Sequence, residues 1–188
     1  MDQDTSILWR RIDRPGHEYA RLSRLDTGWR LEGVALFEHD GLPCNLSYGV
    51  TCDAEWITKR AQVVGWVGSS AVNVTIIADT AHVWRLNDQI CEGVAGSLDV
   101  DLNFSPSTNL LPIRRLGLAV GQRAEVRAAW LRFPGFTLEP LVQSYTRTNE
   151  RSYVYESGGG RFVAQLEVAD AGWPVAYGNI WSSEARSS

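Results

Sequence analysis

The chain has 188 residues, of which 44% are hydrophobic and 21% are charged. This length is typical of one globular domain, and the share of apolar residues excludes intrinsic disorder. Eighteen basic residues stand against 22 acidic ones, giving a net charge of −4. No basic block is longer than two residues, which disfavours nonspecific nucleic-acid binding.

The sequence predicts a cytoplasmic protein with no integral membrane association. No run approaches the roughly 20 apolar residues of a membrane span. The first fifteen residues carry six charged side chains, where a signal peptide would need an apolar stretch.

Alternation of apolar and polar residues, typical of half-buried strands, runs along nearly the whole chain. Residues 28–38 and 45–53 both alternate, and the turn residues HDGLP at 39–43 separate them. These two stretches therefore predict an antiparallel hairpin. Further strands are predicted at 7–12, 18–25, 57–67, 71–78, 82–86, 123–133, 141–147, 153–156, 162–168 and 175–177.

The cleanest alternation covers residues 97–104, where Leu98, Val100, Leu102 and Phe104 share one face. Residues 105–122 follow, with prolines that remove ladder donors and glycines that tolerate turns, so we expect a long ordered crossover. No linker or repeat divides the chain. We therefore expect a single domain over residues 1–188, all-β, with about ten to twelve antiparallel strands in a barrel, a half-barrel or a large sandwich.

The familiar catalytic signatures are missing from the sequence. It contains no GxSxG, Walker or GxGxxG motif, and its three histidines are not spaced as zinc ligands. We expect no metal and no cofactor. The absence of these motifs favours a protein that is not an enzyme.

Asp99 and Asp101 form a carboxylate pair that lies two residues apart on a predicted strand. Their side chains would point the same way about 6.5–7 Å apart, which borders the separation in inverting glycosidases. Three interpretations stay open for this pair: acid and base catalysis, contacts to a ligand or an arginine, and a solvated strand face.

Arg114 and Arg115 stand in the crossover that follows. Either could form a buried ion pair with Asp99 or Asp101, which would hold the crossover against the sheet. The alternative is that one arginine is left free to hold a ligand headgroup.

A hairpin between residues 141–147 and 153–156 would gather polar aromatic side chains. Gln143, Tyr145 and Arg147 share one strand face, and Tyr153 and Tyr155 share a face of the next strand. Such a surface can stack on sugar rings, or it can be an ordinary outer face. Trp130 and Arg132 repeat the pairing of an aromatic ring with a guanidinium.

Several stretches resemble the bacterial putative glycolipid-binding family, formerly a domain of unknown function. They are WRLEGVA from Trp29, YGV from Tyr48, DAEWIT from Asp53, DVDLNFSPSTNLLPIRRLGL from Asp99, AAW from Ala128, QSYTR from Gln143 and YVY from Tyr153. The resemblance implies a β-rich, incompletely closed barrel with a cavity, similar in shape to bacterial lipoprotein and glycolipid carriers.

The favoured hypothesis is a non-enzymatic protein that binds a lipid or glycolipid as its partner in the cavity of a curved sheet. Two alternatives remain: a small hydrolase of sugar or lipid conjugates that uses the aspartate pair, and a protein-interaction module. The oligomeric state is left open. The candidate ligand-binding residues are Asp99, Asp101, Asn109, Arg114, Arg115, Trp130, Arg132, Gln143, Tyr145, Arg147, Tyr153 and Tyr155.

Overall fold

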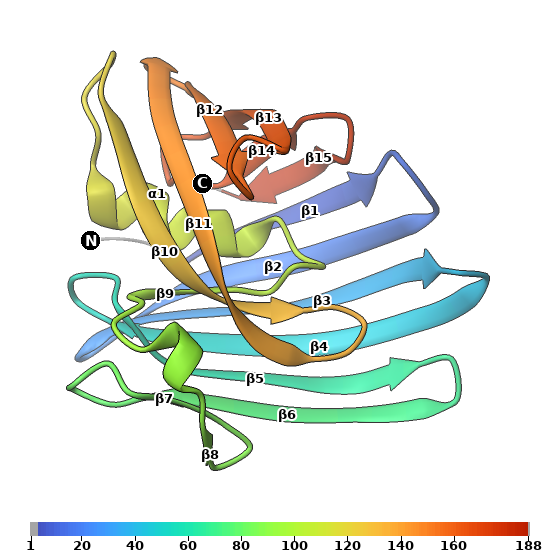
Figure 1. The fold of residues 1–188 in the computed structure, drawn as a ribbon. Helices are drawn as coiled ribbons and strands as arrows, with labels where there is room; N and C mark the ends of the chain where they lie inside the picture. Colours follow the sequence, from blue (N-terminus) through green and yellow to red (C-terminus); the bar gives the residue numbers. More distant parts are fainter. Residues whose placement is uncertain (1–3, 188) are drawn as a thin grey trace.

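A computed structural model describes residues 4–187, and its fifteen strands form one large sheet (Figure 1). The first half of the chain supplies β1 (Thr5–Arg11), β2 (Gly16–Leu25), β3 (Gly28–His39), β4 (Leu42–Asp53), β5 (Thr58–Val67), β6 (Ser70–Ala78), β7 (Trp84–Leu86), β8 (Gln89–Ile90) and the 3-10 turn η1 (Glu92–Val94). The second half supplies β9 (Asp99–Asp101), the 3-10 turn η2 (Ser107–Asn109), α1 (Leu110–Leu116), β10 (Arg123–Arg132), β11 (Thr137–Asn149), β12 (Ser152–Ser157), β13 (Phe162–Val168), β14 (Pro174–Tyr177) and β15 (Trp181–Ser187).

The chain runs outward from the middle of the sheet over β1 to β8, and then starts again at the opposite edge with β9 and runs inward to β15, which lies beside β1. From one edge to the other the order is β8-β7-β6-β5-β4-β3-β2-β1-β15-β14-β13-β12-β11-β10-β9. Every pairing is antiparallel except that of β9 with β10. No helix within residues 4–187 is long and apolar enough to cross a membrane.

The sheet curves until its β9 edge returns to β5, but it does not close into a barrel. Thr58, at the start of β5, donates its backbone N–H to the carbonyl of Leu98 at 2.9 Å. Its hydroxyl accepts the N–H of Val100 at 3.1 Å. These contacts replace a ladder of paired strands, and the expected all-β, incompletely closed barrel is confirmed.

The concave side of the sheet is filled by a helical segment, residues 107–116, which lies between the two halves (Figure 1). On one side the Tyr48 hydroxyl of β4 is hydrogen bonded to Ser107 Oγ at 2.7 Å. On the other side the Tyr145 hydroxyl of β11 donates to Asn109 Oδ1 at 2.9 Å. Leu110 and Leu111 are fully buried in the main hydrophobic core.

The helical segment occupies the stretch in which the sequence predicts a long ordered crossover and no helix. Its prolines do not prevent a helix, because Pro106 lies just before η2 and Pro112 lies in the first turn of α1, where no partner for a backbone N–H is needed. Gly117 ends α1 with a φ of +51°, a left-handed conformation that favours glycine.

The strand expected at residues 97–104 is shorter than its alternation predicts, since β9 covers only Asp99–Asp101. Asp101 Oδ1 accepts the backbone N–H of Asn103 at 2.7 Å, and Asn103 has a φ of +26°. This local turn competes with the sheet and stops the strand.

The count of ten to twelve strands is too low. The strands β8 and β15 were not predicted from the sequence. β15 has the sequence WSSEARS, which lacks apolar alternation, and its place is set by pairing with β1 and β14 instead.

Tyr48 crosses a neighbouring strand to reach a third one. It lies opposite Gly33 of β3, and its hydroxyl meets Glu18 of β2 at 2.6 Å. A Cβ atom at position 33 would lie 2.5 Å from the Tyr48 hydroxyl and 2.5 Å from the carbonyl oxygen of Tyr19. Glycine at position 33 therefore makes this interior contact sterically possible.

We predict that Gly33→Ala lowers the free energy of unfolding by about 1–3 kcal/mol, because the added methyl overpacks the interior. Chemical denaturation with urea measures this change. Gly49→Ala is the matched control on β4, since its Cβ would meet only Arg30 Nη2 at 3.8 Å. Equal stability of Gly33→Ala and Gly49→Ala would contradict the steric account.

Candidate functional site

A cavity of about 360 Å³ lies where residues from the β9-to-η2 stretch meet the C-terminal strands. Its walls are partly aromatic and aliphatic and partly polar or charged. The lining residues are Arg11, Asp101, Asn103, Phe104, Ser105, Asn109, Trp130, Leu141, Tyr155, Ser157, Phe162, Tyr177, Ile180 and Trp181.

Asp101 is the acidic group of the cavity, and it is positioned by hydrogen bonds on both oxygens. Oδ1 accepts the N–H of Asn103 at 2.7 Å, and Oδ2 accepts Nε2 of Gln143 at 2.6 Å. Burial raises the pKa of Asp101 to about 6, although both hydrogen bonds act to lower it. A carboxyl with this pKa changes charge close to neutral pH.

The hydrogen-bond network continues from Asp101 into the wall of the cavity. Gln143 Oε1 lies 3.4 Å from the hydroxyl of Tyr145, which donates to Asn109 at 2.9 Å. Gln143 and Tyr145 are 1% exposed, so this network orients the groups that line the cavity from behind.

The predicted hairpin forms, and its register places the two sets of side chains on one face. Tyr145 lies opposite Tyr155, and Arg147 lies opposite Tyr153. The rings of Tyr145 and Tyr155 meet edge to face at 5.2 Å, and Tyr155 meets Tyr177 at 5.8 Å. The aromatic face is therefore on the inside of the molecule, and it is divided between the cavity and its surroundings.

A second buried acid, Glu18, adjoins the cavity through Ser105. Glu18 Oε1 accepts the hydroxyls of Ser105 at 2.5 Å and of Tyr48 at 2.6 Å, and Oε2 has no partner within residues 4–187. Burial raises the pKa of Glu18 to about 8, against the hydrogen bonds and the charge of Arg11. Glu18 is thus held largely as the neutral acid at pH 7.

Asp99 does not line the cavity. Its carboxylate accepts Nε of Arg115 at 3.1 Å and Nη2 of Arg115 at 2.5 Å, and its side chain is only 1% exposed. Burial raises the pKa of Asp99, although the hydrogen bonds and charge of Arg115 lower it. Neither aspartate lies on a solvated face, and the two do not open onto one common space.

Four of the candidate residues lie on the cavity wall and two more directly behind it. Asp101, Asn109, Trp130 and Tyr155 line the cavity, while Gln143 and Tyr145 support it. The other candidates lie elsewhere. Arg132 is exposed, with its guanidinium 5.7 Å from the Trp130 ring centroid and 3.5 Å from Glu139.

Arg114, Arg147 and Tyr153 belong to a separate pocket of about 300 Å³, here called the Arg114 pocket. Arg147 donates to three backbone carbonyls, those of Leu118 at 2.7 Å, Asn149 at 3.2 Å and Glu150 at 2.6 Å. The remaining lining residues are Ile113, Gly117, Glu150, Arg151, Val168, Ala169, Asp170 and Gly172.

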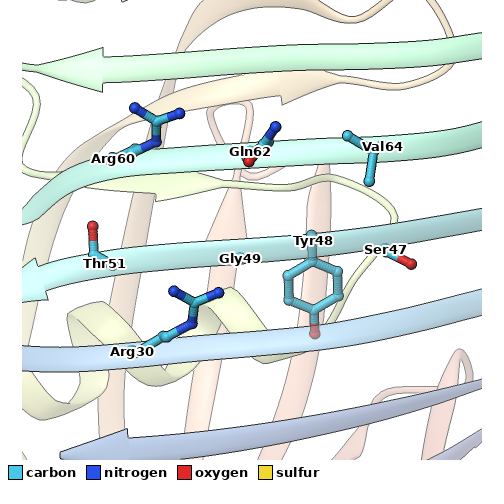
Figure 2. A pocket seen from close by; sticks show the side chains of 8 residues that line it. All are labelled: Arg30, Ser47, Tyr48, Gly49, Thr51, Arg60, Gln62 and Val64. Atoms are coloured by element: carbon cyan, nitrogen blue, oxygen red, sulfur yellow. The ribbon is translucent and has the colours of Figure 1, made fainter. Parts of the chain in front are cut away.

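A third hollow, of about 230 Å³, lies over Gly49 on β3, β4 and β5 (Figure 2). Arg30 and Arg60 stand on either side of Thr51 across the three strands. Arg30 is already hydrogen bonded to Glu32 at 2.7 Å, and the hollow is open to solvent. It exists because Gly49 has no side chain, and it lacks the enclosing walls of the cavity.

Residues 6–183 match the family model described as "Putative glycolipid-binding". The chain belongs to this family. The resemblance identified from the sequence motifs is therefore confirmed. A crystal structure of a DUF1089 family protein from Pseudomonas aeruginosa is 33% identical, with a TM-score of 0.75 over 85% of this chain and 88% of that one. A search of curated proteins found no match.

The motif at residues 99–118, which carries the resemblance to the glycolipid-binding family most densely, contributes to both pockets. It supplies Asp101 and Asn109 to the cavity and Arg114 to the Arg114 pocket. Within residues 4–187 no group of three histidine, cysteine, aspartate or glutamate side chains could hold a metal ion.

Sequence reasoning missed several residues of the cavity and its buried surroundings, namely Arg11, Glu18, Ser105, Phe162, Tyr177 and Trp181. A signal existed only for Glu18, since alternation places it on the same face as Ala20 and Leu22. An acid on an apolar strand face is rare without a partner or a function.

We predict that the free energy of unfolding falls as the pH rises from 5 to 8. The folded chain keeps the Glu18 proton up to about pH 8, whereas an unfolded chain releases it near pH 4.5. Raising the pH between those values therefore favours unfolding, by up to about 1.4 kcal/mol per pH unit for this group. Urea denaturation at several pH values measures the slope.

Glu18→Gln keeps the shape of the side chain but has no proton to release, so it should flatten this slope above about pH 6, where Asp101 no longer contributes. Glu125→Gln changes an exposed carboxyl and serves as the control. If Glu18→Gln retained the full slope of the unmodified chain, the assignment to Glu18 would be wrong.

Proposed function

We propose that this member of the glycolipid-binding family is a non-enzymatic binding protein that holds an amphipathic lipid or glycolipid. The observation that carries the proposal is the mixed lining of the cavity. Phe104, Trp130 and Ile180 offer apolar surface, while Asp101 and Asn109 offer hydrogen-bonding groups in the same space. A ligand with a polar and an apolar part matches such a lining.

The polar part of the ligand is proposed to lie beside Asp101. Its carboxylate can accept hydroxyl protons, and the Asn109 side chain lines the same cavity. Tyr155 and Trp130 add ring faces and edges, which suit the alternating polar and apolar surfaces of a sugar ring.

The size of the cavity limits how much of a lipid it can take. Ligand pockets span roughly 300–1,000 Å³, so 360 Å³ lies near the lower end. Leu110 and Leu111 of the helical segment already fill the concave face of the sheet. We therefore propose that the headgroup enters the cavity and that the chain leaves past Phe162, which is 37% exposed.

The contacts of Asp99 favour binding over hydrolysis through an aspartate pair. Asp99 accepts two hydrogen bonds from the Nε and Nη2 atoms of Arg115, and Asp101 alone of the two aspartates lines the cavity. A pair of carboxyls acting on one bond must both reach it.

We predict that freshly purified protein retains an amphiphile, seen as a mass increment in native mass spectrometry and identified after organic extraction. After extraction, the chain should bind n-octyl-β-D-glucoside below its micellar concentration. Trp130→Ala should weaken this binding about tenfold, because it removes an aromatic wall of the cavity.

Trp66→Ala is the matched control for this experiment. Trp66 is 53% exposed on β5 and does not line the cavity. Absence of any retained amphiphile together with absence of octyl glucoside binding would refute the proposed function, as would equal losses in the two tryptophan variants.

A further inference from the structure

The two adjacent arginines at the end of α1 are used differently. Arg115 is held by Asp99 through two hydrogen bonds. Arg114 makes no hydrogen bond and no ion pair with any residue of 4–187, and its Nε atom is buried without a partner. A buried donor left unpaired is destabilising, so a partner is expected.

Packing fixes the Arg114 guanidinium while leaving its donors free. Its Cζ atom lies 5.2 Å from the ring centroid of Trp56, which stacks on Trp29 at 4.5 Å and 16°. Gly172 lies against the aliphatic part of the Arg114 side chain. A Cβ atom at position 172 would lie only 3.0 Å from Arg114 Cδ. A stacked guanidinium keeps its N–H groups in one plane and available at its edge.

The other charges of the Arg114 pocket leave an excess of positive charge. Arg147 donates to three backbone carbonyls, which leaves its positive charge unpaired by an acid. Arg151 forms an ion pair with Asp170 at 3.0 Å. The three arginines face two acids, Glu150 and Asp170. This gives a formal excess of one positive charge in a pocket of about 300 Å³.

The Arg114 pocket is separate from the cavity. The two share no lining residue, since the helical segment contributes Asn109 to the cavity and Ile113 and Arg114 to the pocket. A ligand at Arg114 is therefore independent of the binding function proposed for the cavity.

We propose that the Arg114 pocket is a second binding site, which takes a phosphate group. Phosphate oxygens accept several coplanar N–H donors at once, and they carry the negative charge that the pocket lacks. The phosphate could belong to a small soluble molecule or to a lipid headgroup, because the chemistry at Arg114 is the same for both.

This site is tested by titrating the full chain with inorganic phosphate and measuring binding by calorimetry and by NMR. In the unmodified protein the Arg114 Nε–H resonance should shift with phosphate. Arg114→Gln should weaken phosphate binding roughly tenfold or more, as expected for loss of a charge-assisted hydrogen bond. Arg114→Lys keeps the charge but loses the planar donors, so it should restore only part of the affinity.

Arg123→Gln is the control, because it removes the same charge from an exposed side chain outside the pocket. Trp130→Ala should bind phosphate normally, which separates this site from the cavity. A parallel arm compares vesicles of phosphatidylcholine with and without phosphatidic acid. Binding of phosphatidic acid vesicles alone, lost in Arg114→Gln, would assign the site to a lipid headgroup.

The proposal would be overturned by either of two results. One is that neither phosphate nor phosphatidic acid vesicles bind the unmodified chain. The other is that Arg123→Gln weakens binding as much as Arg114→Gln does, since the effect would then be one of net charge.

Discussion

The buried ion pair between Asp99 and Arg115 ties the edge strand β9 to the last turn of α1. With Asp99 only 1% exposed, loss of Arg115 would leave an uncompensated charge inside the protein, at a cost of about 3–5 kcal/mol. This contact fixes the C-terminal end of the helical segment to β9. The helical segment is thereby held against the concave face of the sheet.

Several other features depend on the position of β9. Thr58 bonds to Leu98 and Val100 on either side of Asp99, which brings the edge of the sheet back to β5. Asp101 follows two residues later and meets Gln143 at the cavity. The helical segment then separates the cavity beside Asn109 from the Arg114 pocket. A single crossover therefore builds two pockets of different chemistry.

Several polar and acidic side chains are buried in the interior of this protein. Glu18 and Asp101 are buried acids whose pKa values are raised by burial. Glu18 accepts the hydroxyls of Ser105 and Tyr48, and Asp101 accepts a backbone N–H and the Gln143 amide. Burying such groups costs stability unless they are hydrogen bonded. Asp101 is thereby held in the lining of the cavity, where the proposed function places the polar part of the ligand.

The sequence was sufficient to predict most strands and the hairpin that holds Tyr145 and Tyr155, whereas the register of that hairpin comes from the structure. Period-two alternation is a local property, and it survives wherever one strand face is buried. The motif at residues 99–118 was recognised as important, but its helix was not predicted because two prolines and short apolar spacing resemble a loop. The place of β15 depends on β1, at the other end of the chain.

The assembly of the candidate site was less accessible to sequence reasoning. Ser105 meets Glu18 across 87 positions of sequence, and no local pattern encodes that distance. From the sequence, either Arg114 or Arg115 could pair with an aspartate, and the other could bind a ligand. Only the fold shows that Arg115 faces Asp99 while Arg114 stacks on Trp56.

Hydrogen–deuterium exchange with and without n-octyl-β-D-glucoside tests most directly whether the cavity is the ligand site. The account predicts slower exchange in residues 101–109 and around Trp130 and Tyr155, with β5 and β6 unchanged. Protection confined to the outer hollow over Gly49, or no protection at the cavity, would contradict the account.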